Sequence, residues 1–551
     1  MKKLINFFLF LGIAFSTSGF SHAGDSSSTE FFLPVEILNN TNLFQNADVY
    51  FLVKGINPVT GNECFLFFDD NGQGQYVDIT KDTKSKDFSF ILSDYLTDEN
   101  GIQLRIPQLV SGRIYLSLIR PMELEIKDAE GTLRIVDADG FKPRDANYYT
   151  LYDKVELTYV DGGSWVNPTA VDFFSLPIRI EQEGALSEST VAGLDRNREQ
   201  AFEQLRKIVS QEDKTTNQEW NKLFLSFTDS NSKTTTLRFM SPGKAMAKHV
   251  EGAIPFDEKY LNNAQLYGVN WTDFIWDYYK THSLLIDTSE LRHINPLPGD
   301  EYLFKGFVDG ETERWVFSTD AGFVVEIEKP ETSVPFFAGA IYPFDAANNT
   351  PKAIIIRQLT SAFEVGLLPL ADGVTLDRFY LTNHMNDYFK ANQLLSEAEQ
   401  GPWYDLYSKA LHSFGDEEPI YSFAYDDALG QDGTLHDPNA SNLSKVKITL
   451  GDMTGTEIAD PYLDDIVYDV TVLIGEGSEV IHKGRVLHYG DVLGGVTTPF
   501  EVTLNGEKAE IYFKPVMVHP NFPSADGILV QKDPQITDNI TITFPSNPSK
   551  K

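Results

Sequence analysis

The chain has 551 residues, with 80 acidic and 45 basic side chains and a formal net charge of −35. Phosphate backbones are bound by clustered Lys and Arg, so this balance argues against nucleic acid or an anionic membrane surface as partner. A neutral polymer fits better, because 13% of the residues are aromatic and aromatic rings stack on the apolar faces of sugars.

The first 23 residues have the pattern of a secretory signal peptide. Lys2 and Lys3 precede an apolar run from Leu4 to Phe15, and small residues then lead to Ala23. Cleavage near Ala23 predicts export to the periplasm or beyond, and the apolar run is too short to span a membrane in the mature protein.

Cysteine use is the next constraint. Cys64 is the only cysteine, so no intramolecular disulfide can form and the fold must depend on its core. We expect Cys64, within ECFLFF, to be a buried small hydrophobic residue.

Along the chain, the hydrophobic period changes more than once. Short alternating runs with Gly turns predict an all-β part, helical spacing then predicts a mixed α/β part, and Gly-joined strand patterns return near the C-terminus. The predicted units are 31–182 (β), 186–370 (mixed α/β), 371–455 (a return to the first unit) and 456–551 (a C-terminal β domain).

Helical spacing is clearest from Leu186 to Val209, where Ser187 or Ser189 is a possible N-cap. Further predicted helices and strands are Trp271 to Lys280, Ala353 to Phe363 and Asp387 to Ala398 (helices), and Glu301 to Val308 and Arg314 to Val325 (strands).

Two carboxylates lie in strand-like, otherwise apolar surroundings between Leu151 and Pro177. Around Glu156 the apolar and polar residues alternate, and Asp172 lies between Val171 and Phe173. If the two strands pair about Ser164, Glu156 and Asp172 face each other.

Two carboxyl groups across a sheet can separate into a general acid and a general base or nucleophile. Glycoside hydrolysis uses such a pair, with separations of about 5–5.5 Å for retention and about 6.5–9.5 Å for inversion. The alternative is that both are solvated strand residues.

This stretch resembles glycoside hydrolase family 64, together with LPVEILNNT, SGRIYLSL and YSFAYDDALG, which begin at Leu33, Ser111 and Tyr421. The resemblance runs from about Phe31 to about Gly455. Members of that family are secreted endo-acting β-1,3-glucanases with a thaumatin-like β-barrel. The resemblance therefore implies a mainly β fold, in which a thaumatin-like barrel or sandwich and a mixed α/β domain form a cleft. The strands beyond it predict a C-terminal β-sandwich-like domain, either a carbohydrate-binding module or a structural cap.

The resemblance also implies roles for individual residues. Glu156 matches the general acid and Asp172 the general base of an inverting hydrolysis of β-1,3-glucan to short laminari-oligosaccharides. No cofactor is implied. The family usually has Asn where this chain has Val160, which removes one hydrogen bond from the cleft. The matching substrate-binding positions are Asp145, Thr158, Trp165 and Thr169, with Asp426 or Asp427 facing the glucan.

Several residues also allow other interpretations. Thr158 and Thr169 could be ordinary strand residues, and Asp145 could be a turn residue. The acidic run at Asp426 and Asp427 lacks the spacing of a calcium loop. His384, His412 and His436 match no compact zinc motif, so no metal is predicted.

Two other functions are compatible with the sequence. One is a non-catalytic thaumatin-like glucan-binding protein, which would bind without cutting. The other is a structural or adhesive surface protein, which would leave the paired carboxylates without a purpose.

Overall fold

The computed structural model describes the chain from Phe32 to Ala459, with gaps, and beyond that only the course of the strands. The predicted signal peptide lies outside the described residues. The gaps are 96–100, 130, 142–144, 161–162, 185–189, 214–217, 230, 250–270, 331–349, 391–403, 416, 432 and 442.

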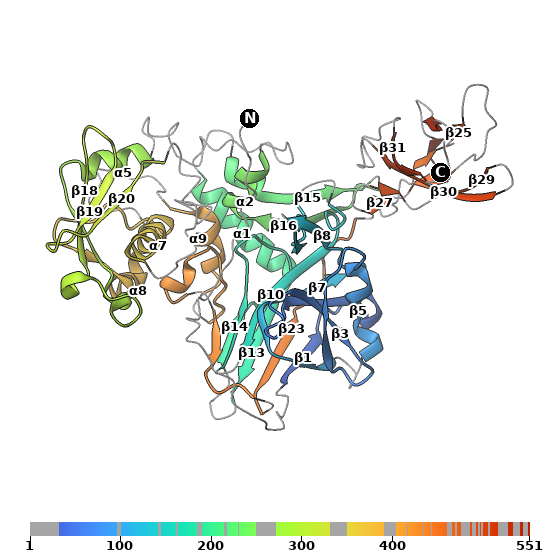
Figure 1. Cartoon of the computed structure of the whole chain (residues 1–551), viewed down its shortest axis with the longest axis horizontal. Helices are drawn as coiled ribbons and strands as arrows, with labels where there is room; N and C mark the ends of the chain where they lie inside the picture. The colour runs from blue at the N-terminus through green and yellow to red at the C-terminus, as the bar shows by residue number, and fades with distance from the viewer. Residues whose placement is uncertain are drawn as a thin grey trace.

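Two sheets make up the first part of the molecule (Figure 1). In the five-stranded sheet, β1 lies between a parallel neighbour, β23, and an antiparallel one, β6. Strand β23 comes from more than 400 residues later in the sequence, so the end of the described region completes the sheet that its beginning starts. The order is β14 (Thr190–Gly193), β13 (Ile178–Glu183), β23 (Lys445–Leu450), β1 (Leu33–Asn39) and β6 (Gly101–Ile106).

The second sheet has eight strands and carries the stretch around Glu156. On its strand β10 (Leu151–Val160), Val155, Leu157 and Tyr159 are buried, whereas Glu156 and Thr158 are only half-buried. The alternation predicted for this strand is therefore confirmed. The order is β22 (Leu435–Asp437), β11 (Gly163–Pro168), β10, β7 (Leu109–Leu118), β2 (Val49–Ile56), β3 (Glu63–Phe68) and β4 (Gly74–Asp78), with β5 (Ser89–Ile91) beside β2.

The prediction of a mainly β protein is confirmed, but the strand pairing of the described residues closes neither sheet into a barrel. Both sheets instead contribute side chains to one hydrophobic core. Cys64 belongs to that core, as expected, and burial raises the pKa of its thiol to about 12.

A third sheet, of five strands, lies with its helices on the other side of the molecule in Figure 1. Its core includes Trp276 of helix α5 (Trp271–Tyr279) against Trp315 of β19, with ring centroids 5.1 Å apart. Helix α7 (Pro351–Glu364) begins at the N-cap Thr350, whose side chain accepts from the amide of Ala353. The strand order is β20 (Val324–Ile327), β19 (Trp315–Ser318), β18 (Leu303–Val308), β17 (Leu284–Asp287) and β21 (Thr375–Leu376).

The first helix starts later than predicted. Residues 190–193 form β14, and α1 (Arg198–Glu212) begins only after the N-cap Asn197, whose side chain accepts from the amide of Gln200. The prediction of an N-cap at Ser187 or Ser189 was wrong, because pairing of β14 with β13 takes the residues that would have formed the first helical turn.

Likewise, the helix predicted from Asp387 reduces to a 3-10 turn, Met385–Asp387, followed by an extended Tyr388. Its later half lies outside the described residues.

The remaining elements complete the description. Among the described residues no helix is long and apolar enough to cross a membrane. The other elements up to 459 are β8 (Glu125–Ala129), β9 (Thr132–Val136), β12 (Phe173–Phe174), β15 (Phe224–Thr228), β16 (Thr234–Met240), α2 (Pro242–His249), α8 (Arg378–Asn383), α9 (Leu406–His412) and the 3-10 turn η8 (Asp426–Ala428). Beyond 459 the strands that the structure describes are β24 (Ile466–Tyr468), β25 (Thr471–Ile474), β26 (Arg485–Leu487), β27 (Val492–Leu493), β28 (Val496–Thr497), β29 (Phe500–Leu504), β30 (Glu507–Pro515), β31 (Gly527–Lys532), β32 (Ile540–Thr543) and β33 (Ser549–Lys550).

Candidate active site

The register of the hairpin formed by β10 and β11 decides how the two candidate carboxylates are placed. Val160 pairs with Gly163, and Glu156 pairs with Asn167. The expected pairing about Ser164 was therefore wrong, and Asp172 does not face Glu156 across the hairpin. Strand β11 ends at Pro168, which has no amide hydrogen for further pairing, and Asp172 follows in the connection to β12.

Glu156 stands in a row of polar residues that runs across the second sheet. It pairs in register with Arg113 of β7, and Arg113 pairs with Lys54 of β2. Nη2 of Arg113 lies 3.5 Å from Oε1 of Glu156. Burial opposes the charge on the guanidinium, but Glu156, Tyr115 and Asp172 together outweigh it and the pKa of Arg113 is raised. Glu156 thus has one cationic neighbour at the outer limit of an ion pair.

Asp172 lies between two lysines. Its Oδ2 is ion-paired with Nζ of Lys154, and its Oδ1 lies 2.9 Å from Nζ of Lys244 of α2. Burial alone would favour the neutral acid, yet these two charges hold the pKa of Asp172 far below its usual range. Lys154 and Glu156 point to the same face of β10, because they are two residues apart. The structure therefore brings Asp172 to the sheet face that carries Glu156.

Two of the predicted substrate-binding residues lie on this same face. Thr158 pairs with Trp165, and Trp165 pairs with His436 of β22. The rings of Trp165 and His436 stack with centroids 4.5 Å apart and planes 13° apart. One face of Trp165 is therefore covered by His436.

Thr169, just beyond β11, is buried. It forms an isolated bridge with Tyr421, from the returning part of the chain. Its Oγ1 and the Oδ1 of Asn167 are both buried without a hydrogen-bond partner among the described residues. Such atoms are uncommon in folded proteins and call for a water or ligand partner.

The carboxylate of Asp145 stabilises the loop in which Asp145 itself lies. Its carboxylate accepts from the amides of Asp139 and Asn147, each at 2.7 Å, and from Nδ2 of Asn147 at 2.9 Å. Burial raises the pKa of Asp145. These contacts favour the interpretation as a turn residue.

Asp426 and Asp427 differ completely in exposure. Asp426 is fully buried, and its Oδ2 accepts from the hydroxyl and amide of Ser422, each at 2.8 Å, and lies 3.0 Å from Nε2 of His412. Its Oδ1 is buried without a hydrogen-bond partner among the described residues, whereas Asp427 is exposed, so Asp427 is the more accessible of the two to a glucan. Among the described residues no group of His, Cys, Asp and Glu could hold a metal ion.

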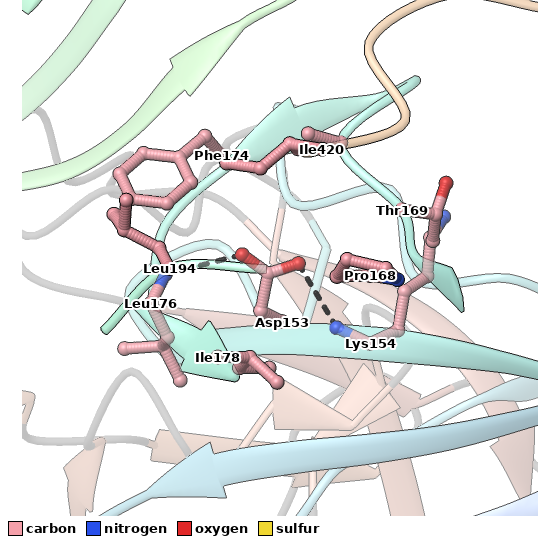
Figure 2. A pocket seen from close by; sticks show the side chains of 10 residues that line it. Asp153, Lys154, Pro168, Thr169, Phe174, Leu176, Ile178, Leu194 and Ile420 are labelled. Atoms are coloured by element: carbon pink, nitrogen blue, oxygen red, sulfur yellow. Dashed lines mark hydrogen bonds between the residues drawn. The ribbon is translucent and has the colours of Figure 1, made fainter. Parts of the chain in front are cut away.

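A buried carboxyl lies behind the site. Asp153 points to the opposite face of β10 from Glu156 and lines a small cavity of about 20 Å³ (Figure 2). Its Oδ2 accepts from the amides of Ser175 at 2.9 Å and Leu176 at 3.1 Å, and its Oδ1 accepts from the amide of Lys154 at 2.9 Å. Burial outweighs these donors and raises the pKa of Asp153 to about 7. The contacts tie the segment that follows β12 to β10.

The sequence interpretation missed the basic partners of both carboxylates. Arg113, Lys154 and Lys244 surround the site, and Asp137, after β9, forms ion pairs with both Arg113 and Lys54. The available signal was a charged residue within an otherwise apolar strand, as Arg113 is in SGRIYLSL. A strand interior rarely holds such a residue without a partner.

The fold and the site together define a mainly β protein in which one sheet face carries two candidate carboxylates and an aromatic residue, the composition expected of a carbohydrate-active site. The family model of glycoside hydrolase family 64, described as beta-1,3-glucanase, matches residues 32–447. The chain therefore belongs to glycoside hydrolase family 64.

Curated relatives and solved structures agree with this assignment. The chain is 24% identical over 358 residues to a glucan endo-1,3-beta-glucosidase of Cellulosimicrobium cellulans, and equally so to one of Arthrobacter sp. (strain YCWD3). Each match covers 65% of this chain but only 55% of the relative, so the chain spans about half the length of these relatives.

Two crystal structures share the fold over most of this chain. A laminaripentaose-producing beta-1,3-glucanase in complex with laminaritetraose has a TM-score of 0.56 and 22% identity, covering 76% of this chain and 99% of that one. A family 64 beta-1,3-glucanase domain from Clostridium beijerinckii has a TM-score of 0.55 and 18% identity, covering 76% and 98%.

Proposed function

We propose that the protein is an endo-β-1,3-glucanase that cleaves glucan to short laminari-oligosaccharides with inversion, Glu156 being the general acid and Asp172 the general base. The main support is that two carboxylates reach one sheet face in unlike charge settings. Asp172 is ion-paired with two lysines, whereas Glu156 has one guanidinium 3.5 Å away. Different electrostatic surroundings move the pKa values of two carboxyl groups apart, so that one can act as the acid and the other as the base.

In the proposed reaction Glu156 gives its proton to the glycosidic oxygen as the bond from the anomeric carbon to that oxygen breaks. Asp172 takes a proton from a water molecule that attacks the anomeric carbon from the opposite side. Thr158, Trp165, Thr169 and Asp427 are proposed to contact the sugar. The reaction needs no cofactor.

The wider arrangement belongs to the same proposal. We infer a thaumatin-like arrangement of the first two sheets, with the glucan cleft between them and the mixed α/β unit. The signal peptide would be removed near Ala23, and the protein would act outside the cytoplasm. The role of 456–551, as a carbohydrate-binding module or a cap, stays open within this proposal.

One observation favours a second candidate, a non-catalytic glucan-binding protein. Both oxygens of Asp172 are already paired, Oδ2 with Lys154 and Oδ1 with Lys244. The two lysines hold the pKa of Asp172 low and so make it a weak base, which becomes stronger if substrate binding moves one lysine away. Lys244 is the candidate to move, because its side chain is 38% exposed whereas that of Lys154 is 5% exposed.

The test is release of reducing sugar from linear β-1,3-glucan by the mature protein, beside Glu156→Gln and Asp172→Asn. We expect release by the wild type and loss of at least about a thousandfold in both variants, with glucan binding kept. The anomeric configuration of the first product, followed by NMR, tests inversion. Binding without release by the wild type would favour the second candidate. Release by Glu156→Gln at the wild-type rate would refute the assignment of the acid.

A further inference from the structure

Asp137 gathers three polar side chains of the second sheet around one carboxylate. It follows directly after β9 and forms ion pairs with Arg113 and Lys54. The hydroxyl of Tyr115, two residues from Arg113 on β7, donates to Oδ1 of Asp137 at 2.6 Å. Arg113 and Lys54 lie in the register row of Glu156, and Tyr115 pairs with Lys154, two residues from Glu156 on β10. All three partners therefore point to the sheet face that carries Glu156.

Arg113 therefore has a carboxylate on either side. Its Nη1 is directly ion-paired with Oδ2 of Asp137, whereas its Nη2 stays 3.5 Å from Oε1 of Glu156. All three side chains are about one-fifth exposed, so water screens neither contact strongly. A guanidinium can form a two-pronged pair with a carboxylate, and here Asp137 has the closer contact.

We propose that Asp137 is a positioning residue for the general acid: by engaging Arg113 and Lys54, it keeps the guanidinium from pairing fully with Glu156. This inference rests on the proposed role of Glu156 as proton donor. A fully paired guanidinium would favour the carboxylate form of Glu156 and leave no proton to give.

The arrangement also suits the step in which Glu156 loses its proton. The proton moves to the glycosidic oxygen, which takes the electron pair of the breaking bond, and Glu156 becomes a carboxylate. Arg113 at 3.5 Å is then close enough to stabilise that new negative charge. Asp137 thus limits the pairing before the step without removing the cation that assists during it.

Other charged groups near Glu156 have partners of their own. Lys154, two residues along β10, is paired with Asp172, and so is Lys244 from α2. Lys54 is buried, which lowers its pKa to about 8, and its second carboxylate neighbour is Glu63 of β3.

Glu63 itself is engaged outside this row. It is paired with Arg134 of β9 at 3.2 Å. Asp172 also acts on Arg113 electrostatically, but its two oxygens are paired with Lys154 and Lys244. Among the described residues, Asp137 is therefore the carboxylate whose direct ion pair with Arg113 competes with Glu156.

The experiment titrates Glu156 directly, by infrared difference spectroscopy on the carboxyl band that Glu156→Gln removes. We expect Asp137→Asn to lower the midpoint of Glu156 by about one pH unit or more, since a free guanidinium neighbour lowers a carboxyl pKa by about 1–3 units. The alkaline limb of sugar release should move down equally. The matched control is Asp128→Asn, which removes an exposed carboxylate of the same hairpin that pairs with Lys81 at 2.9 Å. Asp128→Asn should shift neither the titration midpoint of Glu156 nor the alkaline limb of sugar release.

A double variant separates positioning from a general structural role. Arg113→Met alone should raise the titration midpoint of Glu156. Adding Asp137→Asn to Arg113→Met should lower that midpoint by less than half of what Asp137→Asn does in the wild type. An unchanged midpoint in a folded Asp137→Asn, or an equal drop without Arg113, would overturn the inference. Because the titration needs no turnover, it decides this point even if the wild type releases no sugar, a result that would refute only the proposed function.

Discussion

Asp172 and Lys154 form an ion pair from Oδ2 to Nζ that joins the connection after β11 to the middle of β10. The side chain of Lys154 is only 5% exposed, so its charge has almost no contact with water. Loss of one member of a buried pair leaves the other uncompensated, which is costly. The pair therefore holds together the part of the site that carries the proposed base.

We predict that Lys154→Met lowers the free energy of unfolding by about 3 kcal/mol at pH 7. In the wild type the pKa of Asp172 is depressed, so its contribution to stability is present above the ordinary pKa of Asp, about 3.9, and is lost only as the pH falls through the lower folded value. In the variant, burial favours protonated Asp172. The difference in the free energy of unfolding between wild type and Lys154→Met, measured by urea unfolding, should therefore become smaller from pH 7 to pH 4.

The control for this prediction is Lys244→Met, which removes the more exposed partner of the same carboxylate. Because exposed pairs contribute little, we expect a loss of at most about 1 kcal/mol. Equal losses in the two variants, or a gap for Lys154→Met that does not change with pH, would contradict the account.

How much of this site could be read from the sequence depends on the distance over which each feature is encoded. The alternation around Glu156 is local, and the structure confirms it. The register of β10 against β11 depends on a turn whose residues allowed more than one pairing, and Glu156 pairs with Asn167, five residues before the expected Asp172. A small register error moves every partner along the strand.

The sequence could show that Arg113 needs a partner, but not which residues its partners are. Arg113, Asp137 and Lys244 come from β7, the end of β9 and α2, and nothing in their local sequence shows that these elements meet. Conversely, the position of Asp426 in an acidic run suggested exposure, yet Ser422 and His412 supply it with buried partners. Long-range packing decides such cases.

The stacked pair of Trp165 and His436 predicts a binding effect. On the Glu156→Gln background, Trp165→Ala should weaken binding of laminari-oligosaccharides about fivefold, as loss of one aromatic contact is worth about 1 kcal/mol. His436→Ala should have a smaller effect, because His436 supports the ring from behind. Titration calorimetry measures both.

Phe379→Ala is the matched control for Trp165→Ala, since Phe379 is an aromatic residue of α8 that is 76% exposed. It should leave affinity unchanged. If Trp165→Ala binds as tightly as its parent, or if Phe379→Ala loses as much, the ring does not mark a sugar subsite.

Arg238 of β16 predicts a stability effect away from the carboxylates. Its fully buried guanidinium donates to the carbonyl of Gly140, to that of Tyr148 at 3.1 Å and to that of Thr150 at 2.8 Å. Lysine keeps the charge but cannot reach all three carbonyls. We expect Arg238→Lys to lower the free energy of unfolding by about 2 kcal/mol or more.

Arg134→Lys, at a largely exposed site, is the comparison for Arg238→Lys and should change stability by less than about 0.5 kcal/mol. Urea unfolding measures the free energy of unfolding of both variants and of the wild type. If the two variants lose equal stability, the three carbonyl contacts of Arg238 do not stabilise the fold.

Asp153 predicts how stability depends on pH near neutrality. Burial raises its pKa to about 7 in the folded protein, against about 3.9 in an unfolded chain. Between these values the folded state holds a proton that the unfolded state has lost, so stability falls as the pH rises from about 4 to about 7. Asp153→Asn removes this titration, so its urea midpoints should fall less over that window than those of the wild type. Asp128→Asn, with an exposed carboxyl, should instead follow the wild type. Parallel curves for Asp153→Asn and wild type would show that Asp153 is ionised when buried, with its three amide donors outweighing the loss of solvation.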